Sequence, residues 1–165
     1  MPDVPSCLFA AIIAIAIALG VANGFNDAAN AIGTVISTRV LSPGRAIIMA
    51  AFLNFAGAAT GTAVALTIGN ILKQEAFQGI LGHYTLLAAL LSVVIWVFFA
   101  SYHGMPVSSS HGLVAGLAGA GVATAGIGAV NWGILGTIAS AVVSAPVLGF
   151  AGGFIVMVCL IWLLR

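Results

Sequence analysis

The chain has 165 residues, of which 62% are hydrophobic and only 4% are charged, and its formal net charge is +1. A soluble domain carries about 25% charged residues, so this composition excludes a soluble globular protein. It also leaves no basic patch for nucleic acid. We expect an all-α integral membrane protein that crosses the cell membrane several times. Cys7 and Cys159 lack the spacing of a metal site or a disulfide, and free thiols are expected.

Long apolar stretches follow one another along the chain and are expected to form one transmembrane domain over residues 1–165. A helix needs about 20 apolar residues to cross a hydrocarbon core of about 30 Å. Arg39 and Arg45 lie in one short loop, which the positive-inside rule places on the cytoplasmic side. The two chain ends are then expected on opposite faces of the membrane. The expected segments are about 6–38, 46–72, 83–101, 104–128 and 131–164.

The first segment is interrupted by a polar stretch at residues 20–34. An unbroken helix over the segment would be about 50 Å long at 1.5 Å per residue, longer than the hydrocarbon core. We therefore expect this helix to break at Gly20 and Gly24, on either side of Asn23. Discontinuous helices are tolerated in membranes where the freed backbone lines a cavity.

Asp27 is an acid in the middle of this stretch, between Asn26 and Asn30. An ionised carboxylate near the bilayer centre costs from ~3 to ~10 kcal/mol, so something at the site must offset that cost. Asp27 could simply cap a helix or be buried in its protonated form. The flanking amides favour a site for a cation or a substrate instead.

A second interruption contains three successive hydroxyls, from Ser108 to Ser110, after Pro106. Proline suits the first turn of a helix, so the serines are expected at a helix N-terminus, where backbone N–H groups bind anions. A serine-rich turn at the membrane surface is the alternative. Residues 83–125 form either two crossings or one re-entrant hairpin with the serines at its tip. His111 is a further candidate for contact with a proton or the anion.

The two interruptions together predict a binding site near the middle of the membrane. Neither contains Lys or Arg, and Asp27 would repel an anion. A cation bound beside Asp27 and the asparagines removes this conflict of charge. The residues therefore favour a secondary transporter that carries an anion together with a cation.

The stretches GFNDAANAIGTVISTRVLSP and GMPVSSSHGLVAGLAGAG resemble the two signature regions of inorganic phosphate transporters of the PiT family. Here Ser109 and Ser110 stand where threonines are usual. The resemblance implies that Asn26, Asp27 and Asn30 bind sodium or phosphate. It also implies that the serines help to hold phosphate.

Members of that family contain two inverted repeats, each with both signatures, whereas this chain has one copy of each. The resemblance therefore implies one half of a transporter, with a complementary second half or a second copy of the chain as partner. Coupling to sodium or to protons stays open, and no other cofactor is expected. The alternatives are a sulfate permease and an assembly subunit that does not transport. No pairing of a nucleophile with a base suggests an enzyme.

Overall fold

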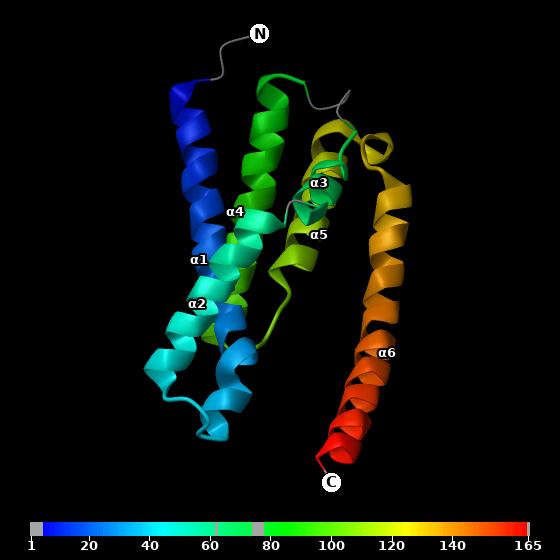
Figure 1. Ribbon diagram of the computed structural model, residues 1–165. Coiled ribbons are helices and arrows are strands. Elements are labelled where there is room, and N and C mark those ends of the chain that lie inside the picture. Colours follow the sequence, from blue (N-terminus) through cyan, green and yellow to red (C-terminus); the bar gives the residue numbers. More distant parts are fainter. Residues whose placement is uncertain (1–4, 62, 74–77, 165) are drawn as a thin grey trace. The chain divides into compact units, whose positions relative to one another are not determined.

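The structure is a computed structural model that describes residues 5–61, 63–73 and 78–164, and residues 63 and 64 by their backbone alone. All regular structure in these ranges is helical, apart from one isolated β-bridge. The helices are α1 (Ser6–Ser37), α2 (Pro43–Thr60), α3 (Ala63–Gly69), α4 (Ile80–Tyr102), α5 (Ser109–Ala125) and α6 (Trp132–Leu163), with a 3-10 turn η2 at Ile127–Ala129 (Figure 1). Three of them, α1, α4 and α6, are long and apolar enough to cross a membrane, as expected for a multi-pass membrane protein.

The first helix is continuous, and the expected break at Gly20 and Gly24 was wrong. α1 keeps α-helical structure over 32 residues, through both glycines and the polar stretch. An unbroken helix keeps every backbone amide paired in a medium that offers no water. Two polar side chains of α1, Asn23 and Asn26, find hydrogen-bond partners on other elements, as described below, so a polar site forms without opening the backbone.

The interruption lies in the second segment instead. α2 ends at Thr60, and Gly61 adopts an extended conformation with φ −108° and ψ 97°. The Gly61 N–H donates to the Gly57 carbonyl at 2.9 Å, and the Thr60 hydroxyl donates to the Ala56 carbonyl at 2.9 Å. These bonds satisfy carbonyls at the end of α2. Residues 46–72, expected as one segment, therefore form the two helices α2 and α3.

α4 is the central helix of the first part of the fold, with α1 packed on one side and α5 on the other (Figure 1). Leu90 of α4 is buried with Leu8 and Ile12 of α1. One turn further on, Val93 and Val97 of α4 are buried with Ala22 of α1. The core thus extends along α1 as far as its polar stretch, and it fixes where that stretch lies against α4.

α4 and α5 form a hairpin whose connection, residues 103–108, we call the tip. Gly112 and Gly116 of α5 face α4, and a Cβ added at Gly116 would lie 2.9 Å from Val93 Cγ2 and 3.1 Å from the Ala89 carbonyl. Small residues let helix backbones approach closely in lipid. With 23 residues, α4 has the length of a complete crossing, and α5 is shorter with 17.

The Cα packing divides the chain into two compact units, residues 1–130 and 131–165. The second unit contains α6, whose N-terminus is capped by the Asn131 side chain, which accepts from the Ile134 N–H at 3.4 Å. Pro146 lies inside this helix without ending it. Cys7 in the first unit and Cys159 in the second are both free and exposed.

Candidate functional site

The polar stretch of α1 places its amides and its acid on one face of the helix. Asn23, Asn26, Asp27 and Asn30 follow one another at the spacing i, i+3, i+4 and i+7, which brings side chains together on one side of an α-helix. Part of this face is bonded to the end of α4, to the tip and to the first residue of α5. The structure therefore brings together the two polar stretches that the sequence singled out.

Asn26 joins α1 to α4 and to the tip. Its amide nitrogen donates to Ser101 Oγ at 3.0 Å and to the Met105 carbonyl at 3.4 Å. Its carbonyl oxygen accepts from the Val107 N–H at 3.2 Å. Asn26 thus holds the backbone on both sides of Pro106.

Ser108, Ser109 and Ser110 lie at the N-terminus of α5, as the sequence predicted. Ser108 is the N-cap, and its side chain accepts from the His111 N–H at 3.3 Å. The His111 ring Nδ1 lies 2.6 Å from the same hydroxyl oxygen. The predicted place of Pro106 in the first helical turn was wrong, because α5 begins only at Ser109.

A second contact joins α1 to α5 directly. The Ser109 hydroxyl donates to the side-chain carbonyl oxygen of Asn23. Ser109 is half-buried, whereas Ser108 and Ser110 are exposed. The three serines therefore differ in their surroundings, and Ser109 is bonded to the polar face of α1.

Asp27 and Asn30 are exposed in the described part of the chain, while Asn26 is half-buried. Asn30 lines a polar cavity of about 310 Å³ between α1 and the tip. Asp27 is on the same face of α1, between Asn26, which is bonded to the tip, and Asn30, but it is not among the residues that line this cavity. The lining residues of this cavity are Phe25, Asn26, Ala29, Asn30, Ser101, Gly104, Met105 and Pro106.

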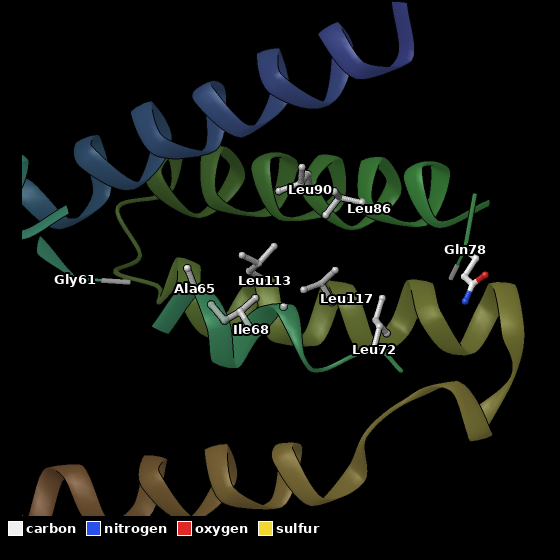
Figure 2. A pocket seen from close by; sticks show the side chains of 10 residues that line it. Gly61, Ala65, Ile68, Leu72, Gln78, Leu86, Leu90, Leu113 and Leu117 are labelled. Atoms are coloured by element: carbon white, nitrogen blue, oxygen red, sulfur yellow. The ribbon is translucent and has the colours of Figure 1, made fainter. Parts of the chain in front are cut away.

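A larger cavity, of about 880 Å³, lies elsewhere and has a different chemistry. Figure 2 shows leucines from α4 and α5 on one side of it and side chains of α3 on the other, with Gln78 at one end. None of its lining residues in the described part of the chain is charged. An oxyanion or an alkali ion needs polar partners, so the smaller polar cavity is the candidate site.

The ends of two helices meet at the tip. The C-terminus of α4 and the N-terminus of α5 carry partial charges of opposite sign, negative for α4 and positive for α5. All four Lys and Arg residues of the chain lie outside the two polar stretches. The local field at the tip therefore comes from Asp27, from the polar side chains and from the two helix ends.

Two residues of this site, Asn23 and Ser101, were not among the predicted site residues. Asn23 could have been found, because it lies one helical turn before Asn26 on the same face of α1. Ser101 gave no such signal, since a serine near the end of an apolar helix commonly bonds its own backbone. Only the packing of α4 against α1 shows its partner.

Comparison with known proteins shows the family to which the chain belongs. Residues 23–165 match the family described as the phosphate transporter family. A probable low-affinity inorganic phosphate transporter of Bacillus subtilis (strain 168) is 41% identical over 93% of this chain and 46% of its own length. A protein of the same description from Streptomyces halstedii is 40% identical over 99% of this chain and 76% of its own length.

A solved structure described as the sodium-dependent phosphate transporter is similar with a TM-score of 0.80 and 32% identity. The match covers 87% of this chain and 36% of the solved one. The chain thus spans about half the length of the Bacillus subtilis relative and about a third of the solved chain. The family match includes Asn23, Asn26, Asp27 and Asn30 of α1 and Ser108–Ser110 of the second polar stretch, and the chain belongs to the phosphate transporter family.

Proposed function

We propose that the chain forms one half of a symporter that carries inorganic phosphate across the membrane together with sodium ions or protons. The proposal rests on the contacts of Asn23 with Ser109 and of Asn26 with the tip. They hold the polar face of α1, suited to a cation, next to the N-terminus of α5, suited to an anion. Membership of the phosphate transporter family supports phosphate as the substrate.

The anion is assigned to the N-terminus of α5. Ser108, Ser109 and Ser110 offer hydroxyls, and the first backbone N–H groups of the helix add donors and a partial positive charge. His111 lies 2.6 Å from the Ser108 hydroxyl through its Nδ1 atom. It is therefore placed to exchange a proton with this hydroxyl or to contact the anion.

The cation is assigned to the face of α1 that carries Asn26, Asp27 and Asn30. Hard cations take oxygen ligands from carboxylates, side-chain amides and backbone carbonyls. The polar cavity of about 310 Å³ is lined by Asn26, Asn30 and Ser101. The negative end of α4 lies beside it and favours a positive charge.

The direction of the hydrogen bond between Ser109 and Asn23 favours phosphate over sulfate as the substrate. Its hydrogen is donated to Asn23, so its oxygen faces other groups as an acceptor. Phosphate at neutral pH carries a hydrogen that can be donated to such an acceptor, and sulfate does not. The site therefore suits a protonated tetrahedral oxyanion.

The partner of the chain is a complementary second half or a second copy of itself. The chain spans 46% of the Bacillus subtilis relative, so that protein is long enough to hold two such units. Exposed polar groups such as Asp27 and Ser110 are costly against hydrocarbon. A partner that covers the polar face of α1 removes this cost.

The test is counterflow of labelled phosphate into proteoliposomes that contain the purified chain, alone and with any second half encoded beside it. Sodium-dependent counterflow is expected, and exchange driven by a pH gradient without sodium would indicate proton coupling. A matched preparation carrying Ser109→Ala and Ser110→Ala serves as the control. Equal counterflow of phosphate in protein-free liposomes and in every preparation would contradict the proposal.

A further inference from the structure

Asn26 is held in one orientation by the backbone of the tip. The Met105 carbonyl can only accept a hydrogen bond and the Val107 N–H can only donate one. The amide nitrogen of Asn26 must therefore face Met105, and its oxygen must face Val107. The second hydrogen of this nitrogen then points to Ser101 Oγ, 3.0 Å away.

Ser101 differs from Ser92 and Ser140, two other serines in the apolar helices. Ser92 of α4 donates its hydroxyl to the Ala89 carbonyl of its own helix at 2.7 Å, and Ser140 of α6 donates to Thr137 in the same way. The bond recorded for Ser101 runs to a different helix, 75 residues away in the chain. The Ser101 hydroxyl oxygen therefore joins two helices by a hydrogen bond, whereas the Ser92 hydroxyl bonds only within its own helix.

We infer that Ser101 is a positioning residue for the substrate site: by accepting from Asn26 it holds the tip, and with it the N-terminus of α5, against the polar face of α1. The effect of Ser101 on transport rests on the proposed function. The effect of Ser101 on the position of the tip does not. Removing the Ser101 oxygen leaves one hydrogen of a half-buried amide without its partner. The Asn26 amide then keeps only its bonds to Met105, at 3.4 Å, and to Val107, at 3.2 Å, and without the third bond to α4 it holds the tip less firmly.

Val107 provides a reporter for the tip that does not depend on transport. It is half-buried and packs against the cluster of Ala22, Val93 and Val97. A cysteine at this position is shielded while the tip is held and becomes accessible when the tip moves away. The natural Cys7 and Cys159 are exposed and are first replaced by serine.

The experiment measures the rate at which Val107→Cys is labelled by a polar thiol reagent in proteoliposomes of the whole chain. Ser101→Ala should raise this rate about two- to tenfold, the range of one net hydrogen bond. Ser101→Thr keeps the hydroxyl and should leave the rate unchanged. Ser92→Ala is the matched control, because it removes a hydroxyl from the same helix without touching the tip.

An unchanged labelling rate in Ser101→Ala, or an equal rise in Ser92→Ala, would overturn the inference. If Ser101→Ala does not fold, the pair Ser101→Thr and Ser101→Val isolates the hydroxyl at constant shape.

In a transport measurement, loss of this positioning should raise the KM for phosphate. A higher half-saturation for sodium with unchanged labelling would make Ser101 a cation ligand instead and also overturn it. Faster labelling in a chain that does not transport would support the positioning role while contradicting the proposed function.

Discussion

Ser109, the first residue of α5, donates its hydroxyl hydrogen to the side-chain carbonyl of Asn23 on α1. One bond therefore joins the two polar stretches at the level of individual atoms. The same bond determines whether the Ser109 hydroxyl can donate or accept a hydrogen bond with a ligand. With its hydrogen committed to Asn23, the Ser109 oxygen presents its lone pairs, and a ligand must supply the hydrogen.

Replacing Asn23 should therefore weaken the selection of phosphate over sulfate. In Asn23→Ala the Ser109 hydroxyl is free to donate to sulfate, so inhibition of phosphate uptake by sulfate should strengthen several-fold. Arsenate also carries a hydrogen at neutral pH, and its inhibition should change little. Asn23→Asp keeps an acceptor for Ser109 and should retain the selectivity. Parallel changes for sulfate and arsenate would argue against this role of Asn23.

Asp27→Asn should abolish cation-coupled uptake without harming insertion into the membrane. The substitution removes the negative charge proposed to attract the cation, and it removes a charge that is costly near hydrocarbon. Uptake at varied sodium concentration and the yield of inserted protein are the two measurements. Normal sodium-dependent transport by this variant would refute the role assigned to Asp27.

The serines of α5 should contribute separately to the affinity for phosphate. A lost hydrogen bond to a charged group is worth about 1.5–3 kcal/mol, so Ser109→Ala and Ser110→Ala should each lower the apparent affinity about tenfold or more. Ser109→Thr keeps the hydroxyl and should have a mild effect. Unchanged affinity for phosphate in both alanine variants would show that Ser109 and Ser110 do not bind phosphate.

Gly116 should be sensitive to the smallest enlargement. A Cβ there would meet Val93 Cγ2 at 2.9 Å and the Ala89 carbonyl at 3.1 Å, so Gly116→Ala should destabilise the hairpin by about 1–3 kcal/mol. Gly119 of the same helix has open space where its Cβ would lie, and Gly119→Ala should be neutral or slightly stabilising. Unfolding of the purified chain in detergent compares the two variants directly.

The purified chain should associate with a homologous second half or with itself. Crosslinking through the exposed Cys7 or Cys159, with accessibility labelling to establish orientation, tests this expectation. A distinct second half is favoured, because the basic residues at Arg39 and Arg45 bias the chain toward one orientation. A stable monomer that transports phosphate in bilayers would contradict the requirement for a partner.

Composition and polar interruptions were enough to predict the helical membrane fold and the place of Ser108–Ser110 at a helix N-terminus. They misplaced the discontinuity, which lies at Gly61 rather than at Gly20 and Gly24. The sequence suggests a break wherever glycine and polar residues interrupt an apolar run. Whether the backbone opens depends on whether polar side chains find partners elsewhere, and in α1 Asn26 finds them on α4 and the tip, and Asn23 on α5.

Contacts between distant segments could not be predicted from local pattern. In the sequence, Ser101 looks like any serine of an apolar helix, and its role appears only from the packing of α4 against α1. Pro106 looks like the start of a helix, but in the structure it lies in the tip, whose backbone is bonded to Asn26. In both cases the deciding bond joins residues 75 or more positions apart.

The unbroken α1 also determines how deep in the bilayer the site lies. From Leu8, at the start of the apolar run, to Asn26 is about 27 Å along the helix axis at 1.5 Å per residue. A helix tilt of about 40°, the upper end of the usual range, shortens this to about 21 Å of depth in a core of about 30 Å. With Leu8 at one edge of the hydrocarbon, Asn26 therefore passes the midplane and lies in the leaflet that borders the Arg39 loop. A ligand would then have a short path to the proposed site from that side and a long one from the other. A transporter must be able to close the long path, and the elements that pack beside α1 would have to close it.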